Sequence, residues 1–187
     1  TEKWLTWYQY QFERNKPVDP QIAENKSKLK VQPNKMQKEA LGEIQSLRQN
    51  GKNKALIISA TGTGKTYLGA FDVQKFKPKR FLYVVHREQI LQKSRNSFYD
   101  VIGGAYSDYG IYSGNHREGL KSKYIFATVQ TLAKDENLKK FARDAFDYIL
   151  FDEAHHLGSV QELKIFNYFQ PQFCLGMTAT PERTDDF

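Results

Sequence analysis

The feature of this sequence that most restricts its fold is a glycine loop, Ser59 to Thr66, with the letters SATGTGKT. The loop follows the apolar run Ala55 to Ile58 and precedes a segment, Tyr67 to Lys75, that is predicted to be helical. Gly62 and Gly64 can adopt backbone angles that are closed to other residues, so main-chain N–H groups can approach an anion there. The positive N-terminus of the following helix points to the same place. Strand, loop and helix together predict a phosphate-binding site.

The end of the loop indicates a nucleotide with its metal ion. In the phosphate-loop pattern G-x-x-x-x-G-K-[ST], the lysine contacts the β- and γ-phosphates and the hydroxyl residue binds Mg²⁺. Lys65 and Thr66 occupy these positions, whereas Ser59 stands where the pattern has glycine. The alternative is a glycine-rich turn that ends in Lys-Thr by chance. The loop residues expected to bind the nucleotide are Thr61, Gly62, Thr63, Gly64, Lys65 and Thr66.

A second segment, Asp147 to His156 (DYILFDEAHH), is predicted to be a buried strand that ends in two carboxylates. In an open parallel sheet, ligands bind at the carboxyl ends of the strands. We expect Asp152 to hold Mg²⁺, through water because this ion dehydrates reluctantly, and Glu153 to orient or deprotonate an attacking water. Solvated acids at a strand end are one alternative. Zinc binding by His155 and His156 is another, although the chain lacks the Cys/His spacing of zinc sites.

Short apolar runs alternate with predicted helices along the chain. Most of the runs are continuously apolar, which indicates strands buried on both faces by helices. The sequence therefore predicts an α/β fold with a doubly wound, mostly parallel sheet and helices on both faces. The expected strands are residues 55–59, 80–85, 109–112, 124–128, 148–152 and 174–178, and the expected helices are residues 38–50, 66–75, 88–99 and 160–168.

Six segments, taken in chain order, carry a resemblance to a known family. They are similar to the Q-tip motif and to motifs I, Ia, Ib, II and III of superfamily 2 helicases and translocases. The nearest group is the DEAD/DEAH type that includes the motor subunits of type I and type III restriction enzymes and the excision-repair helicases. The matching segments are residues 36–41, 60–66, 85–91, 127–132, 152–155 and 176–183.

The resemblance implies a RecA-like domain that binds ATP and Mg²⁺. It covers about residues 33 to 187 and ends at motif III. Motifs IV to VI, which include the arginine finger of a second RecA-like domain, have no counterpart in the chain. We therefore expect residues 33–187 to be the first motor domain of a longer protein. Residues 1–32 are expected to form an aromatic helix and a linker, which pack on the motor core or on a neighbouring domain or contact bases.

The resemblance also assigns roles to single residues. Gln37 would contact adenine, with Met36 in place of the usual aromatic, unless it is only an exposed glutamine at a helix start. His155 would bridge motif II to motif III, and Thr178 and Thr180 would couple nucleotide state to the nucleic-acid track. The residues expected to contact a nucleic-acid backbone are Arg87 and Thr128, followed by Gln130 and Thr131, whose segment could equally cap a helix.

Composition agrees with this hypothesis. The net charge of +7 favours a polyanionic partner, although the lysines between residues 26 and 54 could equally form a solvated face. Cys174 is the single cysteine, which fits a buried small side chain and a reducing, cytoplasmic setting. No run of about 18 apolar residues is present, so the sequence does not indicate a membrane span.

The hypothesis is an ATP-dependent helicase or translocase motor domain that acts on nucleic acid. DNA is favoured over RNA because of the Thr178-Ala179-Thr180 segment and the histidine after Ala154, by analogy only. Two other classes stay open. One is a nucleotide-gated ATPase switch that does not translocate, and the other is a nucleic-acid-binding module with an inactive phosphate loop.

Overall fold

The computed structural model describes residues 31–60, 62–114, 116, 118–154 and 159–179. The chain divides into two compact units, Thr1–Val31 and Gln32–Phe187, and the following description concerns the second. The predicted aromatic helix near the N-terminus lies outside the described residues. The expected boundary after residue 32 stays a prediction.

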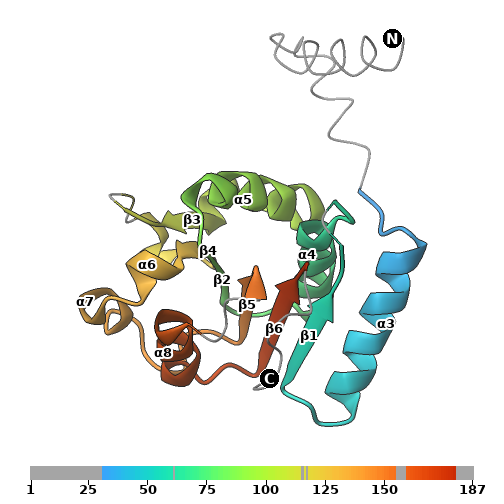
Figure 1. The fold of residues 1–187 in the computed structure, drawn as a ribbon. Coiled ribbons are helices and arrows are strands. Elements are labelled where there is room, and N and C mark those ends of the chain that lie inside the picture. The colour runs from blue at the N-terminus through green and yellow to red at the C-terminus, as the bar shows by residue number, and fades with distance from the viewer. Residues whose placement is uncertain (1–30, 61, 115, 117, 155–158, 180–187) are drawn as a thin grey trace, which may run out of the picture. The chain divides into compact units, whose positions relative to one another are not determined.

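The centre of the domain is a six-stranded sheet in which neighbouring strands pair in parallel. The strand order is β1-β6-β5-β2-β4-β3, so β5 lies inside the sheet and β1 at one edge of it. Because the strands are parallel, their carboxyl ends meet at one edge (Figure 1). The strands are β1 (Lys54–Ile58), β2 (Phe81–Val85), β3 (Tyr109–Tyr112), β4 (Tyr124–Thr128), β5 (Tyr148–Asp152) and β6 (Phe173–Thr178).

Helices cover both faces of the sheet, which confirms the predicted α/β fold. One core cluster joins the sheet to α3, α4 and α5, and a second joins its other face to α6, α7 and α8 (Figure 1). The four-residue helices α6 and α7 are not among the expected helices, although a helix after the strand at Ala127 was an open alternative for the segment of α6. The helices are α3 (Lys35–Gln49), α4 (Lys65–Phe76), α5 (Glu88–Ile102), α6 (Val129–Leu132), α7 (Asp135–Leu138) and α8 (Val160–Tyr168).

Strand β2 shows why the sequence folds in this way. All five of its residues are buried, and they alternate between the two cores. Phe81, Tyr83 and Val85 face the core that contains α5, whereas Leu82 and Val84 face the other. A strand that is apolar on both sides gains free energy from burial only when helices cover both faces, about 25 cal/mol per Å² of apolar area.

Helix α3 begins three residues earlier than expected because of a capping box. The Asn34 side chain accepts a hydrogen bond from the Gln37 backbone N–H, and the Gln37 side chain accepts one from the Asn34 backbone N–H, both at 2.9 Å. These bonds satisfy two of the donors that a helix start otherwise leaves open. They also fix the side chain of Gln37, which is 8% exposed.

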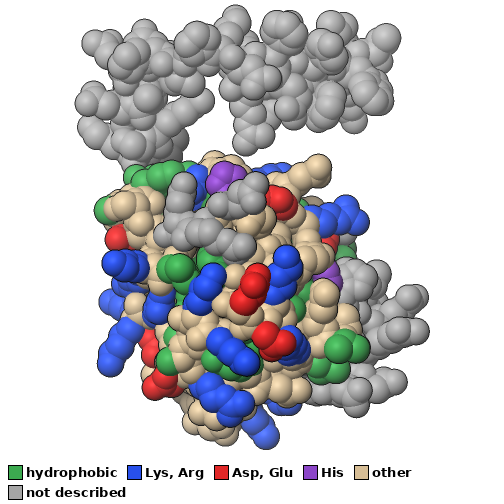
Figure 2. All heavy atoms as spheres, turned by 90° about the vertical axis from the view of Figure 1, so that its left-hand side faces the viewer, with side chains coloured by type: hydrophobic (Ala, Val, Ile, Leu, Met, Phe, Trp, Pro, Cys, Tyr) green, Lys and Arg blue, Asp and Glu red, His purple; other side chains and the backbone are tan. Residues whose placement is uncertain are grey.

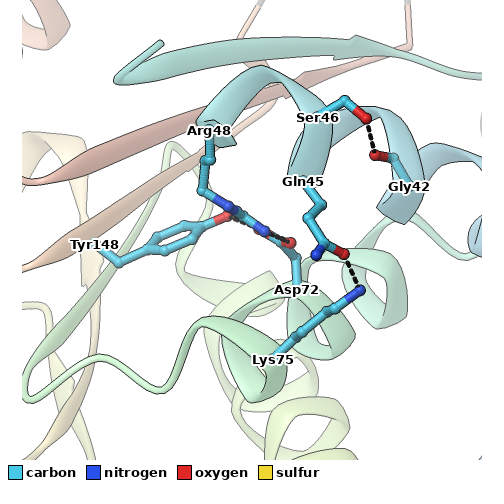
Figure 3. Close-up of polar contacts among 7 residues, drawn as sticks. All are labelled: Gly42, Gln45, Ser46, Arg48, Asp72, Lys75 and Tyr148. Atoms are coloured by element: carbon cyan, nitrogen blue, oxygen red, sulfur yellow. Dashed lines mark hydrogen bonds and ion pairs between the residues drawn. The ribbon is translucent and has the colours of Figure 1, made fainter. Parts of the chain in front are cut away.

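A buried polar cluster holds the other end of α3 (Figure 3). Arg48 on α3 donates two hydrogen bonds, of 2.7 and 2.6 Å, to the carboxylate of Asp72 on α4, and the hydroxyl of Tyr148 on β5 donates a third at 2.7 Å. Asp72 is completely buried. The Arg48 guanidinium also lies 4.8 Å from the ring centroid of Phe173. The cluster therefore ties α3 and α4 to the sheet.

We expect Arg48→Ala to lower the free energy of unfolding by about 3–5 kcal/mol, because it leaves Asp72 buried without its cation. The midpoint of urea denaturation measures the change. Lys75→Ala is the matched control, since Lys75 also bonds α4 to α3, through Gln45, but at an exposed position (Figure 3). Its effect should stay within about 0.5 kcal/mol. Equal midpoints for the two variants would contradict the assignment of Arg48.

Candidate functional site

The predicted phosphate loop leaves the carboxyl end of β1 and enters α4. Gly62 and Gly64 both have a φ of +81°, and Gly64 is the residue that caps the start of α4. The Nζ atom of Lys65 donates hydrogen bonds to the carbonyl oxygens of Ser59, at 2.7 Å, and Ala60, at 2.9 Å. The loop thus has the left-handed glycines that the pattern requires, with its lysine lying across the loop backbone.

Ser59, which departs from the pattern, has a structural partner. Its hydroxyl is hydrogen-bonded to that of Thr63 at 2.9 Å, and Thr63 also donates to the Ala60 carbonyl at 2.8 Å. The Ser59 side chain therefore forms a hydrogen bond within the loop, between its first residue and Thr63. Thr61 lies outside the described residues.

Of the two predicted carboxylates, Asp152 is the last residue of β5 and Glu153 follows it, close to the loop. Asp152 is 8% exposed; its Oδ1 accepts a hydrogen bond of 3.0 Å from the Glu153 backbone N–H, and its Oδ2 accepts one from the Tyr83 hydroxyl. Glu153 has a φ of +62°, which is uncommon for a residue with a side chain. Such backbone strain occurs preferentially at functional sites.

Burial raises the pKa of the Asp152 carboxyl above its usual value. Hydrogen bonds from Tyr83 and from the Glu153 backbone oppose this rise in pKa, the charge of Glu153 adds to it, and the charge of Lys65 lowers it. Burial and the charge of Asp152 hold the pKa of Tyr83 well above its usual value, so Tyr83 stays a donor. Lys65 and Asp152 therefore belong to one electrostatic site.

The donors at this site fit Mg²⁺. This ion prefers oxygen ligands and is commonly held by one or two carboxylates together with water and substrate phosphates. Each carboxylate oxygen of Asp152 accepts a hydrogen bond, from Tyr83 or from the Glu153 backbone, and each has a further lone pair that can bind a water or an ion. Thr66 follows at the start of α4. Among the described residues, no group of three His, Cys, Asp or Glu side chains could hold a metal ion, and His155 lies outside them.

Gln37 contacts the phosphate loop. Its Nε2 donates a 3.2 Å hydrogen bond to the Gly64 carbonyl, while its Oε1 serves the cap of α3. Beside it lies a cavity of about 290 Å³ between α3, β1 and the loop. Met36, at 71% exposure, contributes to the wall of this cavity together with Thr63 and Lys65. The lining is largely apolar, with the Gln37 amide and a few polar side chains, Glu43, Ser59, Thr63 and Lys65, and such a lining suits a heterocyclic base.

Strand β6 lies between β1, which leads into the phosphate loop, and β5, which ends at Asp152. Thr178 pairs with Ile58 of β1, and its neighbour Met177 pairs with Asp152 of β5. The Thr178 carbonyl accepts a 2.9 Å hydrogen bond from the Ser59 N–H at the start of the loop. The predicted coupling residue is thus placed between the loop and the carboxylates. Thr180 lies outside the described residues.

The four residues expected to contact nucleic acid fall into two pairs. Arg87 and Gln130 are exposed just beyond the carboxyl ends of β2 and β4. Thr128 and Thr131 are buried, and their hydroxyls bond to each other at 2.9 Å. The Thr131 hydroxyl also accepts a 3.0 Å bond from the N–H of Gly114. These two threonines position backbone segments in this structure.

Charge alone does not outline a binding surface. Exposed residues around α7 include both positive and negative side chains, and the face in Figure 2 has Asp and Glu side chains among its Lys and Arg side chains.

No helix within the described residues combines the length and the apolar character needed to cross a membrane. Cys174 is buried in β6, as expected, and burial raises the pKa of its thiol to about 12.

Sequence reasoning missed two groups near the site. Tyr83 and Ser94 form a buried hydrogen-bonded pair that ends on Asp152. The Nε2 atom of His86, after β2, lies 3.0 Å from a carboxylate oxygen of Glu162 of α8, which is 1% exposed, and burial lowers the pKa of His86. A signal for Glu162 was present, because Ser159 and Glu162 have the spacing of a capping box, and Ser159 does cap α8.

Comparison with known proteins identifies the family. Residues 30–183 match the family described as the type III restriction enzyme res subunit. The chain belongs to this family. It is 30% identical over 166 residues to the type I restriction enzyme EcoAI endonuclease subunit of Escherichia coli, which covers 82% of this chain and 20% of that protein. This result confirms the resemblance to superfamily 2 motor domains.

Other relatives agree with this assignment. The DNA 3'-5' translocase XPB2 of Sulfurisphaera tokodaii is 30% identical over 136 residues, which span 72% of this chain and 28% of the relative. The fold matches the Hef helicase domain of Pyrococcus furiosus with a TM-score of 0.69 and 21% identity, over 82% of this chain and 34% of that one. The chain thus spans less than a third of the length of the two sequence relatives and about a third of the Hef chain.

Proposed function

We propose that this domain binds Mg²⁺-ATP and that the full-length protein couples its hydrolysis to movement along nucleic acid, with DNA favoured over RNA. The proposal rests on one observation: Lys65 and Glu153 both lie close enough to Asp152, at the carboxyl edge of the sheet, for their charges to interact with that of Asp152. This is the pairing of cation and carboxylates that phosphoryl transfer requires. Relatives named as helicases and a DNA translocase support the choice of activity.

The residues would divide the work. The backbone at Gly62 and Gly64 and the Lys65 ammonium bind the phosphates, which replace the two loop carbonyls as partners of Lys65. Thr66 and Asp152 hold the metal, which when bound neutralises charge that develops on the phosphate oxygens. Glu153 orients the attacking water and accepts its proton. Gln37 and the cavity beside Met36 take the adenine.

A single set of assays separates this function from its alternatives. ATP hydrolysis by the full-length protein is measured with no nucleic acid, with single- and double-stranded DNA, and with RNA. Stimulation by DNA, together with strand or triplex displacement, is the expected result. Hydrolysis that ignores nucleic acid would favour the ATPase switch, absence of Mg²⁺-ATP binding would favour the inactive module, and preference for RNA would favour an RNA helicase.

The nucleic-acid track is proposed to lie at the ends of β2 and β4. Arg87 and Gln130 are exposed there and can contact phosphates directly. Thr128 and Thr131 would act by holding the segments at Gly114 and α6, since their hydroxyls already bond to each other. Such contacts read the backbone, so the choice of base sequence would come from other parts of the protein.

The position of Thr178 leads to a test of coupling. We expect Thr178→Ala in the full-length protein to lower the stimulation of hydrolysis by DNA about fivefold or more, because coupling between sites amounts to 1–3 kcal/mol. Basal hydrolysis should change little. Steady-state hydrolysis with and without DNA measures both, and Thr178→Ser, which keeps the hydroxyl, is the control. Full stimulation in the alanine variant would mean that Thr178 is only structural. The same role is proposed for Thr180, and His155 is proposed to connect motif II, at Asp152 and Glu153, to motif III, at Thr178 and Thr180.

A second RecA-like domain is the proposed partner in the same protein. An arginine finger from such a domain can raise the rate of phosphoryl transfer by about 10³- to 10⁵-fold in phosphate-loop enzymes. We therefore expect this domain alone to turn over ATP slowly. A cytoplasmic setting stays a proposal that rests on the single, buried cysteine.

A further inference from the structure

Tyr83 occupies an unusual place for a polar side chain. It lies in the middle of β2, next to β5, and none of its surface is exposed. Its ring is fixed between Phe98 of α5 and Phe126 of β4, with centroid distances of 5.6 and 5.4 Å. A buried phenol hydroxyl needs partners, and a phenylalanine here would fill the same space without that requirement.

The partners of this hydroxyl connect a helix to the candidate metal site. Tyr83 donates to Asp152 Oδ2 and accepts a 3.0 Å hydrogen bond from the hydroxyl of Ser94 on α5. Ser94 is 1% exposed. With the Glu153 N–H on Oδ1, both oxygens of Asp152 are held from the protein side, so the carboxylate cannot rotate freely. Groups that orient a ligand in this way typically change metal affinity by about 10- to 100-fold.

We propose that Tyr83, itself oriented by Ser94, is a positioning residue that fixes Asp152 for Mg²⁺ and makes the metal affinity of the nucleotide site depend on helix α5. The inference deepens the proposed function and rests on it. Helix α5 starts immediately after Arg87, and Ser94 lies two turns along it. A nucleic acid bound at Arg87 would therefore act on the helix that carries Ser94, the partner of the Tyr83 hydroxyl.

The chain contains a matched control for the loss of this hydroxyl. Tyr148 is also completely buried, lies on the adjacent strand and donates its hydroxyl to a buried carboxylate, that of Asp72. Asp72 belongs to the Arg48 cluster and not to the metal site. Tyr83→Phe and Tyr148→Phe thus remove the same group from comparable surroundings, and only the first touches Asp152.

The experiment uses the full-length protein and a fluorescent, non-hydrolysable ATP analogue. Its affinity is measured in EDTA and across a Mg²⁺ titration for the parent, Tyr83→Phe, Ser94→Ala and Tyr148→Phe. We expect Tyr83→Phe to raise the Mg²⁺ concentration for half-maximal enhancement about 10- to 100-fold with the EDTA affinity unchanged. Ser94→Ala should produce a smaller rise, and Tyr148→Phe none. Urea denaturation verifies that each variant is folded.

Each remaining outcome decides the matter. A parental Mg²⁺ response in Tyr83→Phe, or an equal shift in Tyr148→Phe, would overturn the role of Tyr83 while leaving the proposed function in place. A parent that binds the analogue equally well with and without Mg²⁺ would overturn the proposed function, and this inference with it.

Discussion

Replacing Lys65 with alanine is expected to lower ATP hydrolysis by the full-length protein by about 10²- to 10³-fold or more, since it removes a fixed cation from the developing phosphate charge. The fold should survive, because Lys65 lies on the loop and its side chain contacts only loop carbonyls among its located partners. Steady-state hydrolysis and urea denaturation measure the two effects.

A lysine on the same helix provides the control for Lys65. Lys75 is exposed near the far end of α4, and Lys75→Ala should hydrolyse ATP as the parent does. Two results would contradict the assignment of Lys65: equal hydrolysis by Lys65→Ala and the parent, or an equal loss in both lysine variants.

Local patterns in the sequence were sufficient to predict the fold and to select the residues that are proposed to form the site. The strand from residue 148 to 152 has the apolar run Ile149 to Phe151, and burial on both faces was predicted from that run. The glycines of the loop indicated a left-handed backbone, because glycine adopts a positive φ at little steric cost, and both Gly62 and Gly64 do have a positive φ. Helices α6 and α7 were missed because four residues are too few to show a helical period.

What the sequence could not supply is the set of contacts between distant segments. Tyr83 looked like one more apolar residue of a strand, and only the pairing of β2 with β5 brings its hydroxyl to Asp152. Thr128 and Thr131 were expected to face nucleic acid, whereas the fold buries both. Local patterns predict which residues have reactive or polar side chains, and the register of the sheet determines which of these side chains can reach a ligand.

Gln37 illustrates the same limit. The family resemblance implied an adenine contact for Gln37, and the fold brings this residue to the phosphate loop. In this structure, however, its amide already bonds to Asn34 and Gly64. A base that binds through Gln37 would therefore have to share its amide with the helix cap and the loop, so adenine binding and loop position would be linked.

Glu153→Gln should separate hydrolysis from binding. The substitution keeps the shape of the side chain and the backbone N–H that bonds to Asp152, and it removes the charge that is proposed to accept a proton from water. Turnover by the full-length protein should fall by about 10²- to 10⁴-fold. Binding of Mg²⁺-ATP should survive, because the charge of Glu153 raises the pKa of Asp152 and its loss favours the ionised carboxylate that holds the metal.

The contrast with two other variants makes this prediction decisive. Asp152→Asn removes the carboxylate proposed to hold the ion, so it should lose the enhancement of ATP binding by Mg²⁺, whereas Glu153→Gln should retain it. Affinity for ATP with Mg²⁺ and single-turnover hydrolysis are measured for Glu153→Gln, Asp152→Asn and Lys65→Ala. If Glu153→Gln loses ATP affinity as severely as Lys65→Ala, then Glu153 helps to bind the nucleotide, and the division between a binding lysine and a water-orienting glutamate is wrong.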